Sequence, residues 1–389
     1  MKPGPTRSAP WGSRMAWLLA WRNLAHDRSR FVVTLVGIVF AVVLIAMQIG
    51  LFLGFSDATT VIVRHTHADF WIVARGAQNF EISLPMKDRE LYLARSVPGV
   101  AQAERLLVQF VPWKKPGGGD ESIIIVGFDL NSGLAGPWNL VAGRLEDLRQ
   151  PDGVMVDRVY MEKLGIASTG TELEINGRRA RVVGLTQGIR SFTTSPWVFA
   201  SFRTAQGFSR LADDESNYVI GTFAPGADPV AVRAALAEAL PRSDVYLSDD
   251  FAARTRDYWM FTTGAGASVL VSALLGLLVG SVIVAQVLYA TTVDHLTEFG
   301  TLSAMGAPRD FIYKVILGQA AISATLGHVP GILLALLLAE ASALSAAVVL
   351  VPWELAIGLY GVTLAMCMLA SLISIRKAMG IDPAMVFQR

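Results

Sequence analysis

Residues 31–55 read FVVTLVGIVFAVVLIAMQIGLFLGF, and this run contains no Asp, Glu, Lys, Arg or His. A helix of about 20 mostly apolar residues is long enough to cross the hydrocarbon core of a bilayer. The apolar region of a secretory signal peptide is shorter, about 7–15 residues. We therefore expect residues 31–55 to form a retained transmembrane helix.

Further apolar runs follow later in the chain, at residues 261–291, 311–340 and 355–375. Only the middle one of these three carries basic or histidine side chains, with Lys314 near one end and His328 near the centre. The four runs together predict four transmembrane helices. The fold class we expect is an α-helical membrane protein with an α+β extracytoplasmic domain, residues 56–260, inserted between helices one and two.

The composition agrees with a membrane protein. Hydrophobic residues make up 53% of the 389 residues, and the mean hydropathy is +0.46. Charged residues make up 17%, against about 25% in soluble domains. The net charge of +1 provides no basic surplus for a nucleic-acid partner. The single cysteine, Cys367, excludes a disulfide framework within the chain and a thiolate metal cluster.

The Lys and Arg residues near the spans predict the orientation, because cytoplasmic segments carry an excess of them. Residues 1–30 hold six Lys or Arg and one acid, and the tail, residues 376–389, holds three Lys or Arg. Both segments are therefore expected in the cytoplasm, together with the short segment 292–310. The link 341–354 has no Lys or Arg. We expect this link and the large domain to lie in the periplasm, outside a bacterial inner membrane.

The large domain mixes strand and helix patterns. Its first part, residues 66–115, and its last part, residues 216–250, each read as strand, helix and strand. We expect these parts to pair in one outer lobe, with residues 116–215 as an inserted lobe that is richer in strands. In the inserted lobe, Asn176-Gly177 separates two short strand patterns, and this dipeptide favours a type I′ hairpin turn.

No motif in the chain predicts catalysis. The sequence lacks a G-x-x-x-x-G-K-[ST] phosphate loop, an H-E-x-x-H zinc motif and a G-x-S-x-G nucleophile motif. His65 and His67 stand two residues apart and could share a metal ion. Without a third ligand at a suitable spacing, we favour ordinary polar residues at the foot of the domain. We therefore expect no metal and no cofactor in this chain.

His328 is the one residue in the spans that could act at membrane depth. Ion-coupled transporters carry buried charged residues there. His328 lies near Pro330 and Gly331, where it could donate to a freed carbonyl or lie at a helix interface. We favour either of these over a proton relay. Four spans with so few polar residues also make a poor aqueous channel.

Two glycine pairs are spaced for close helix packing. Gly50 and Gly54 stand four residues apart in the first span, and Gly276 and Gly280 do so in the second. Small residues at this spacing let helix backbones approach closely. They predict tight helix contacts, either within one subunit or between two copies in a dimer.

The cytoplasmic segment contains residues 292–308, which read TVDHLTEFGTLSAMGAP. Apolar residues recur every third position from Val293 to Leu302, which predicts a short helix with an apolar stripe, and Gly306 marks its end. An ordinary turn at the membrane surface would not require the pattern E-x-G-x-L-x-A-x-G-A that begins at Glu298.

That pattern resembles the cytoplasmic signature of the FtsX/MacB permease superfamily. The matching positions are Glu298, Gly300, Leu302, Ala304, Gly306 and Ala307. The family usually has a basic residue near the front of the motif, where this chain has His295 and Thr297. The tail also resembles the family's closing motif, at Arg376, Ala378, Ile381, Pro383 and Phe387. The resemblance covers the whole chain.

Within the superfamily, the chain is most similar to the DevC-type permeases. Residues 16–24 and 28–37 resemble the opening of those proteins, as do residues 68–71 and 98–100 in the large domain. The size of the chain and the lack of a fused ATPase also fit this class.

The resemblance implies the non-catalytic permease subunit of an ABC exporter. Such a subunit pairs with a second copy of itself and with a dimer of cytoplasmic ABC ATPases, which bind ATP and Mg. Residues 292–310 resemble the coupling helix that docks on the ATPase. The residues implied in that contact are Glu298, Phe299, Gly300, Leu302, Ala304, Met305 and Gly306. Closure of the ATPase would then move the periplasmic domain, which is called mechanotransmission.

The resemblance to DevC-like permeases further implies a periplasmic adaptor protein and a TolC-like outer-membrane channel. The exported substrate would be a lipid, a glycolipid, a peptide or a hydrophobic small molecule. Three alternatives stay open. They are an FtsX-like regulator of a cell-wall hydrolase, a lipoprotein-releasing permease and, without support from any catalytic motif, a membrane-anchored enzyme.

Overall fold

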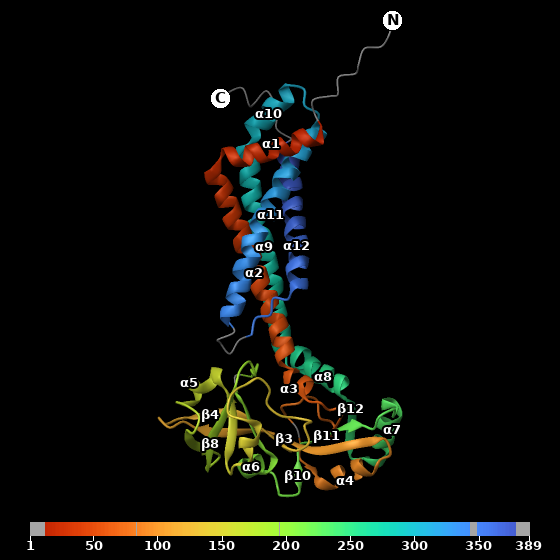
Figure 1. Ribbon diagram of the computed structural model, residues 1–389. Helices are drawn as coiled ribbons and strands as arrows, with labels where there is room; N and C mark the ends of the chain where they lie inside the picture. Colours follow the sequence, from red (N-terminus) through yellow and green to blue (C-terminus); the bar gives the residue numbers. More distant parts are fainter. Residues whose placement is uncertain (1–11, 83, 194, 343–347, 379–389) are drawn as a thin grey trace. The chain divides into compact units, whose positions relative to one another are not determined.

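The computed structural model describes residues 12–82, 84–193, 195–342 and 348–378 (Figure 1). The chain forms two compact units. The helical unit comprises Met1–Phe52, Val269–Ala341 and Val349–Arg389, and the extracytoplasmic unit comprises Leu53–Ser268 and Ser342–Val348. The boundary between Phe52 and Leu53 falls inside helix α2 (Arg28–Ala58), and the boundary between Ser268 and Val269 falls inside helix α9 (Ala265–Asp294). Each of these two helices therefore contributes to both units.

The helical unit contains four helices that are long and apolar enough to cross a membrane. They are α2 (Arg28–Ala58), α9 (Ala265–Asp294), α11 (Arg309–Ser342) and α12 (Trp353–Ala378). Two shorter helices accompany them, α1 (Ser13–His26) and α10 (Leu296–Ala304). The predicted fold class is confirmed, since an α+β unit stands between the first and second of the four long helices. The short link before α12 lies partly outside the described residues.

Glycines allow α9 to pack closely against α2. A Cβ atom added at Gly276 would lie 2.9 Å from Cγ of Gln48, and one added at Gly280 would lie 2.9 Å from Cδ1 of Ile45. Real Cβ atoms do not approach other atoms so closely, so a larger residue at either position would require the facing side chain of α2 or the helix itself to shift. This glycine pair therefore serves contacts within one subunit.

The other predicted glycine pair also faces its own chain. A Cβ atom at Gly50 would lie 2.8 Å from Cγ1 of Val349, and one at Gly54 would collide with the carbonyl of Val348. The backbone N–H of Leu350 donates to the Gly50 carbonyl at 2.9 Å. Gly50 and Gly54 thus make room for the segment that precedes α12.

A third glycine pair, not singled out from the sequence, joins α11 to α2. A Cβ atom at Gly327 would lie 2.6 Å from Cγ2 of Ile38, and one at Gly331 would lie 2.9 Å from Cβ of Val42. Between these glycines stands His328, which is buried. The small residues on both sides explain how α11 can approach α2 so closely near its internal proline.

His328 lies at the interface between α11 and α12. Its ring meets the ring of Tyr360 edge-on, with 5.2 Å between centroids, and it bonds to the backbone of Ala356. The Tyr360 hydroxyl lies 3.0 Å from Oγ1 of Thr325. Of the roles considered from the sequence, this placement agrees with a residue at a helix interface.

The extracytoplasmic unit is built on one ten-stranded sheet with the order β12-β1-β11-β3-β4-β9-β6-β8-β5, in which β7 pairs with β3 and β8. The strands are β1 (Phe70–Ala74), β3 (Val100–Lys114), β4 (Asp120–Phe128), β5 (Leu140–Ala142), β6 (Gly153–Asp157), β7 (Glu172–Ile175), β8 (Arg178–Thr186), β9 (Trp197–Ser201), β11 (Tyr218–Phe223) and β12 (Ser243–Leu247). A separate pair is formed by β2 (Met86–Lys87) and β10 (Glu215–Ser216).

The long strand β3 joins the two lobes expected from the sequence. Its first half pairs with β11, from Val100 to Leu106. Its second half pairs with β4, from Leu106 to Lys114. The sheet therefore continues across residue 116, where the inserted lobe was expected to begin. A single apolar cluster also contains residues from both sides of this boundary, among them Trp71 and Trp197.

Helices cover the faces of this sheet. They are α3 (Val61–His65), α4 (Asp88–Ser96), α5 (Met161–Leu164), α6 (Phe202–Phe208), α7 (Pro229–Ala239) and α8 (Ser248–Asp257). One apolar cluster packs α4 and α7 against the outer strands, and another packs α5 and α6 against the inserted strands. The β7–β8 hairpin turns as predicted, with positive φ angles of 47° at Asn176 and 77° at Gly177.

A buried carboxyl group lies where the loop after β1 meets the start of the second span. Glu81 is 2% exposed, and its Oε2 accepts a hydrogen bond of 2.7 Å from Nε1 of Trp259. Burial raises the pKa of Glu81 from its ordinary 4.5 to about 7. Trp259 belongs to a π-helical turn (Tyr258–Thr262), and its ring contacts that of Phe192 at 4.8 Å.

We expect the Gly280→Leu substitution to destabilise the helical unit by about 1–3 kcal/mol, because the new side chain collides with α2. The measurement is the unfolding temperature of the detergent-solubilised chain, followed by tryptophan fluorescence. Gly361→Leu is the matched control, since nothing lies within 4 Å of a Cβ atom at Gly361 in α12. An unchanged unfolding temperature for Gly280→Leu, with loss of a dimer instead, would place this glycine at a subunit interface.

We expect Glu81 to make the extracytoplasmic unit less stable as the pH rises from about 4.5 to 7. In that window the folded chain keeps the Glu81 proton and the unfolded chain has lost it, so unfolding releases a proton and a rise in pH favours it. The total loss is about 3 kcal/mol, and it is complete above the folded pKa. Glu81→Gln removes this titration, so its unfolding temperature should depend less on pH. Equal pH profiles for both proteins would contradict this role for Glu81.

Candidate coupling site

The short helix α10 (Leu296–Ala304) connects the second span to the third. Its C-terminus is capped by two backbone hydrogen bonds, from Gly306 to the Ser303 carbonyl at 3.0 Å and from Ala307 to the Leu302 carbonyl at 3.1 Å. Gly306 has a φ angle of +87°. This is the Schellman arrangement, in which glycine takes the left-handed position after the helix.

The cap gives a physical reason for part of the signature motif. Leu302 and Ala307, which the cap joins, both pack against the same apolar cluster. A hydrophobic contact between these two positions commonly accompanies a Schellman motif. Leu302, Gly306 and Ala307 therefore stop α10 at a defined residue and turn the chain into α11.

The inner face of α10 packs against its own subunit through Phe299. This side chain is 5% exposed. It belongs to an apolar cluster, which we call the coupling cluster, whose buried members are Ala16, Ala20, Phe299, Phe311, Ile312, Val315 and Ile316. Figure 1 shows α10 and α1 at the same end of the helical unit. The coupling cluster thus holds α10 against both α1 and the start of α11.

His295 points inward at the start of α10. Its imidazole is almost fully buried, and Nδ1 lies 3.1 Å from Oε1 of Glu298. Its ring also lies 6.5 Å from that of Phe299. His295 stands where the family usually has a basic residue, and the structure directs it to Glu298 within the same helix instead of to the exposed surface.

The outer face of α10 contains the side chains that a partner could reach. Glu298, Ala304, Met305 and Gly306 are exposed, and Met305 is the most open of the large apolar residues here, at 63%. We call Glu298, Thr301, Ala304 and Met305 the exposed face of α10. The face combines one acidic group with a small apolar patch.

The residues predicted for docking are thus divided between two faces. Phe299 is buried in the coupling cluster, and Gly300 and Leu302 are partly buried. A partner could not touch Phe299 without opening that cluster. Of the apolar stripe expected from the three-residue spacing, Phe299 and Leu302 face the chain's own helices, whereas Val293 is exposed.

Helix α1 supports α10 and was not foreseen as an element from the sequence. Its small residues Ala16 and Ala20 are buried, while Trp17 and Trp21 are about half exposed. A Cβ atom at Gly318 of α11 would lie 3.2 Å from Cβ of Ala20. Alanines at a four-residue spacing, each followed by a tryptophan on the adjacent side of the helix, were the available signal, and this pattern is typical of a helix in a membrane interface.

Polar contacts join the cytoplasmic ends of the first two spans. Nη1 of Arg30 lies 3.3 Å from Oδ2 of Asp294, and the hydroxyls of Thr34 and Thr291 are 3.1 Å apart. Exposed ion pairs contribute little to stability, but these contacts position the residues that lead from α9 into α10.

The other residues singled out from the sequence do not join this site. His65 stacks on Trp138 with 3.9 Å between ring centroids, and its Nδ1 lies 2.8 Å from the Val61 carbonyl. In the described part of the chain, no group of three His, Cys, Asp or Glu side chains could hold a metal. Of the closing motif, Ile381, Pro383 and Phe387 lie outside the described residues.

Comparisons with known proteins agree with the two-unit organisation. Residues 31–239 match the family model of the MacB-like periplasmic core domain, and residues 270–383 match that of the FtsX-like permease C-terminal region. An uncharacterized ABC transporter permease of Mycobacterium tuberculosis is 26% identical over 373 residues, which cover 95% of this chain and 98% of the relative. A second one from the same species is 25% identical over 375 residues, with the same coverage.

Solved structures give weaker likenesses. The periplasmic region of MacB from Actinobacillus actinomycetemcomitans matches with a TM-score of 0.36 and 14% identity, covering 48% of this chain and 92% of that one. The extracellular domain of the noncanonical ABC-type transporter YknZ from Gram-positive bacteria matches with a TM-score of 0.34 and 16% identity, covering 46% of this chain and 98% of that one.

The family matches and the four apolar helices define the setting of the coupling site. The protein is an inner-membrane protein with a large periplasmic domain between its first two spans. Its full-length relatives are named as ABC transporter permeases, and a permease of that kind works with a cytoplasmic ATPase. The chain belongs to the FtsX/MacB superfamily of ABC transporter permeases.

Proposed function

We propose that this permease transmits the closure of a cytoplasmic ATPase dimer to its periplasmic domain, and so drives export by mechanotransmission. The observation that carries the proposal is α10, a capped helix with one face exposed and the other buried against α1 and α11. ATP and Mg would bind to the ATPase and not to this chain. The working unit would contain two copies of the permease.

The packing of α10 supports the transfer of force into the spans. Phe299 is surrounded by side chains of α1 and α11, among them Ala20 and Phe311. Close-packed interiors have low compressibility, so a displacement of α10 would move the helices that hold Phe299. The exposed face of α10, with Glu298 and Met305, would be the surface that the ATPase contacts.

The spans offer little support for a polar path across the bilayer. In the described parts of the four long helices, each Asp, Glu, Lys or Arg side chain whose exposure is defined lies open at the helix surface, as Lys314 and Glu340 do. The buried polar residues are mostly hydroxyl-bearing, and several of these bond to their own helix, as Thr363 does to Leu359. This arrangement favours mechanical action over an ion relay.

On this proposal, the substrate would be handled in the periplasm. It would be a lipid, a glycolipid, a peptide or a hydrophobic small molecule, passed to a periplasmic adaptor and a TolC-like channel as in DevC-like systems. Regulation of a cell-wall hydrolase and release of lipoproteins would use the same cytoplasmic contact. These alternatives differ from export in the periplasmic partner, which would be a hydrolase or a soluble carrier.

We expect the double substitution Glu298→Arg and Met305→Lys to reduce copurification of the cognate ATPase about tenfold or more, because both side chains lie at the centre of the proposed contact. The measurement is the ATPase recovered with the detergent-solubilised permease, together with the rate of ATP turnover of the complex. Glu146→Arg is the matched control, since Glu146 is an exposed acid in the extracytoplasmic unit.

A substitution at the buried residue Phe299 distinguishes an effect on the stability of the permease from an effect on docking of the ATPase. Phe299→Ala should lower the unfolding temperature of the permease, because it leaves a cavity in the coupling cluster that costs about 3–5 kcal/mol. The double variant at the exposed face should keep the unfolding temperature of the original protein. If the ATPase still assembles with the double variant and turns over ATP normally, α10 is not the docking helix.

A further inference from the structure

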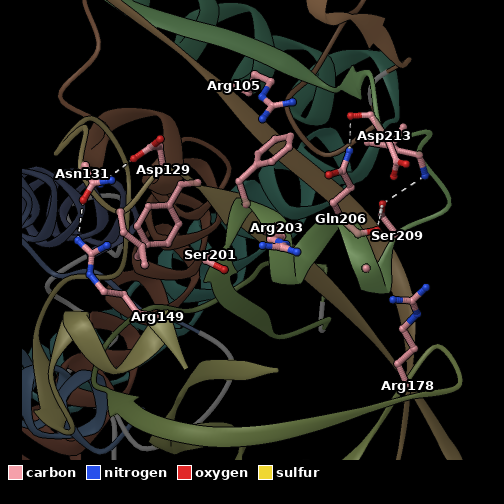
Figure 2. Close-up of a pocket in the computed structure, with 15 residues that line it drawn as sticks. Arg105, Asp129, Asn131, Arg149, Arg178, Ser201, Arg203, Gln206, Ser209 and Asp213 are labelled. Atoms are coloured by element: carbon pink, nitrogen blue, oxygen red, sulfur yellow. Dashed lines mark hydrogen bonds between the residues drawn. The ribbon is translucent and has the colours of Figure 1, made fainter. Parts of the chain in front are cut away.

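The extracytoplasmic unit contains a polar cavity of about 770 Å³ beside α6 (Figure 2). Ten of its fifteen lining residues have polar or charged side chains, and Figure 2 labels these ten. The volume lies in the range of small-molecule sites, about 300–1,000 Å³, but such sites are usually lined by apolar side chains. This lining therefore points to a polar ligand.

Positive charge is in excess around this cavity. Its arginines are Arg105, Arg149, Arg178 and Arg203, and its only acids are Asp129 and Asp213. The carboxylate of Asp129 accepts a hydrogen bond of 2.7 Å from the backbone N–H of Asn131, so it is engaged by its own loop. We call the four-arginine site the arginine cavity.

Two of the arginines are held in place by neighbouring side chains. Arg105 donates to Oδ2 of Asp88 at 2.8 Å, and its guanidinium lies 4.2 Å from the ring centroid of Phe202. Arg149 donates to Oδ1 of Asn131 at 2.6 Å. Groups that are already ordered lose little conformational freedom when a ligand arrives, and this favours binding.

The other two arginines, Arg178 and Arg203, form no ion pair with a residue that the structure describes. Arg178 directly follows the β7–β8 turn, which is tied to α6 by a hydrogen bond of 2.8 Å from Nδ2 of Asn176 to the Phe208 carbonyl. A Cβ atom at Gly207 of α6 would lie 3.1 Å from Nη1 of Arg178. The absence of a side chain at Gly207 thus lets this guanidinium lie against the helix, at the wall of the cavity.

We propose that the arginine cavity binds a molecule that carries phosphate. The planar guanidinium group presents two parallel donors that match the oxygens of a phosphate, and Arg is preferred over Lys for that reason. Four such groups, contributed by β3, β8, α6 and the segment after β5, suit a ligand with more than one anionic oxygen group. The hydroxyl and amide side chains between them can bind neutral hydroxyls of the same molecule.

This site lies in the extracytoplasmic unit, whereas the coupling helix belongs to the helical unit. The inference therefore does not rest on the proposed docking of an ATPase, and either proposal can fail alone. The phosphate could belong to a soluble molecule or to a lipid headgroup, and both would meet the arginines that line this cavity.

The test measures binding of inorganic pyrophosphate to the full chain in neutral detergent at low ionic strength, by titration calorimetry. Removal of two charged hydrogen-bond donors by Arg178→Gln with Arg203→Gln should weaken binding about tenfold or more. The matched control is Arg89→Gln with Arg242→Gln, which removes two exposed arginines of the same unit outside the cavity. The control should bind pyrophosphate as the original protein does.

One further variant and one further ligand make the test more specific. Gly207→Ala keeps all four charges but crowds the Arg178 guanidinium, so it should weaken binding by a smaller factor. A short-chain phosphatidylglycerol, used as a second probe, identifies a headgroup site if it displaces pyrophosphate, and a site for soluble phosphates if it does not. The proposal is overturned if pyrophosphate does not bind, or if the cavity and control variants weaken binding equally.

Discussion

Close contact between α2 and its neighbours holds the helical unit together. Within a bilayer the hydrophobic effect does not drive helices against one another, so packing depends on how closely their backbones can approach. Ile38 and Ile45 of α2 fill the spaces left by Gly327 and Gly280 on two different helices. These two contacts join three of the four long helices, α2, α9 and α11.

A separate set of contacts, between α10, α1 and α11, divides the residues of the cytoplasmic signature motif. The motif has two separable roles, because one set of its residues shapes and anchors α10 while another set is open to a partner. Leu302, Gly306 and Ala307 belong to the first set through the helix cap, and Phe299 joins them through the coupling cluster. Glu298 and Met305 belong to the second. Several residues of the signature motif therefore serve the folding and anchoring of α10, and only part of the motif is open to the proposed partner.

Much of the fold could be predicted from the sequence because it depends on local patterns. Four apolar runs with few charged residues predict four spans, and Asn176-Gly177 predicts the β7–β8 turn. The role of β3 could not be predicted in this way, since a strand pattern does not say which strands pair with it, and β3 pairs with β11 along one half and β4 along the other. The burial of Phe299 and the pairing of Gly327 with Ile38 were hidden for the same reason, because both depend on contacts between segments far apart in the chain.

The extracytoplasmic unit has its own contact between the span ends and the sheet. Phe192 meets Phe55, at the end of α2, with 5.5 Å between ring centroids, and it also meets Trp259. Its loop is held to the inserted strands, since Oδ2 of Asp157 accepts a hydrogen bond of 2.7 Å from the backbone N–H of Ile189. Trp259 lies in a π-helical turn. Such turns are rare in proteins, and those that occur are often found at functional sites. Phe192 therefore links the end of α2 and the turn that precedes α9 to the sheet, a connection that the proposed mechanotransmission would use.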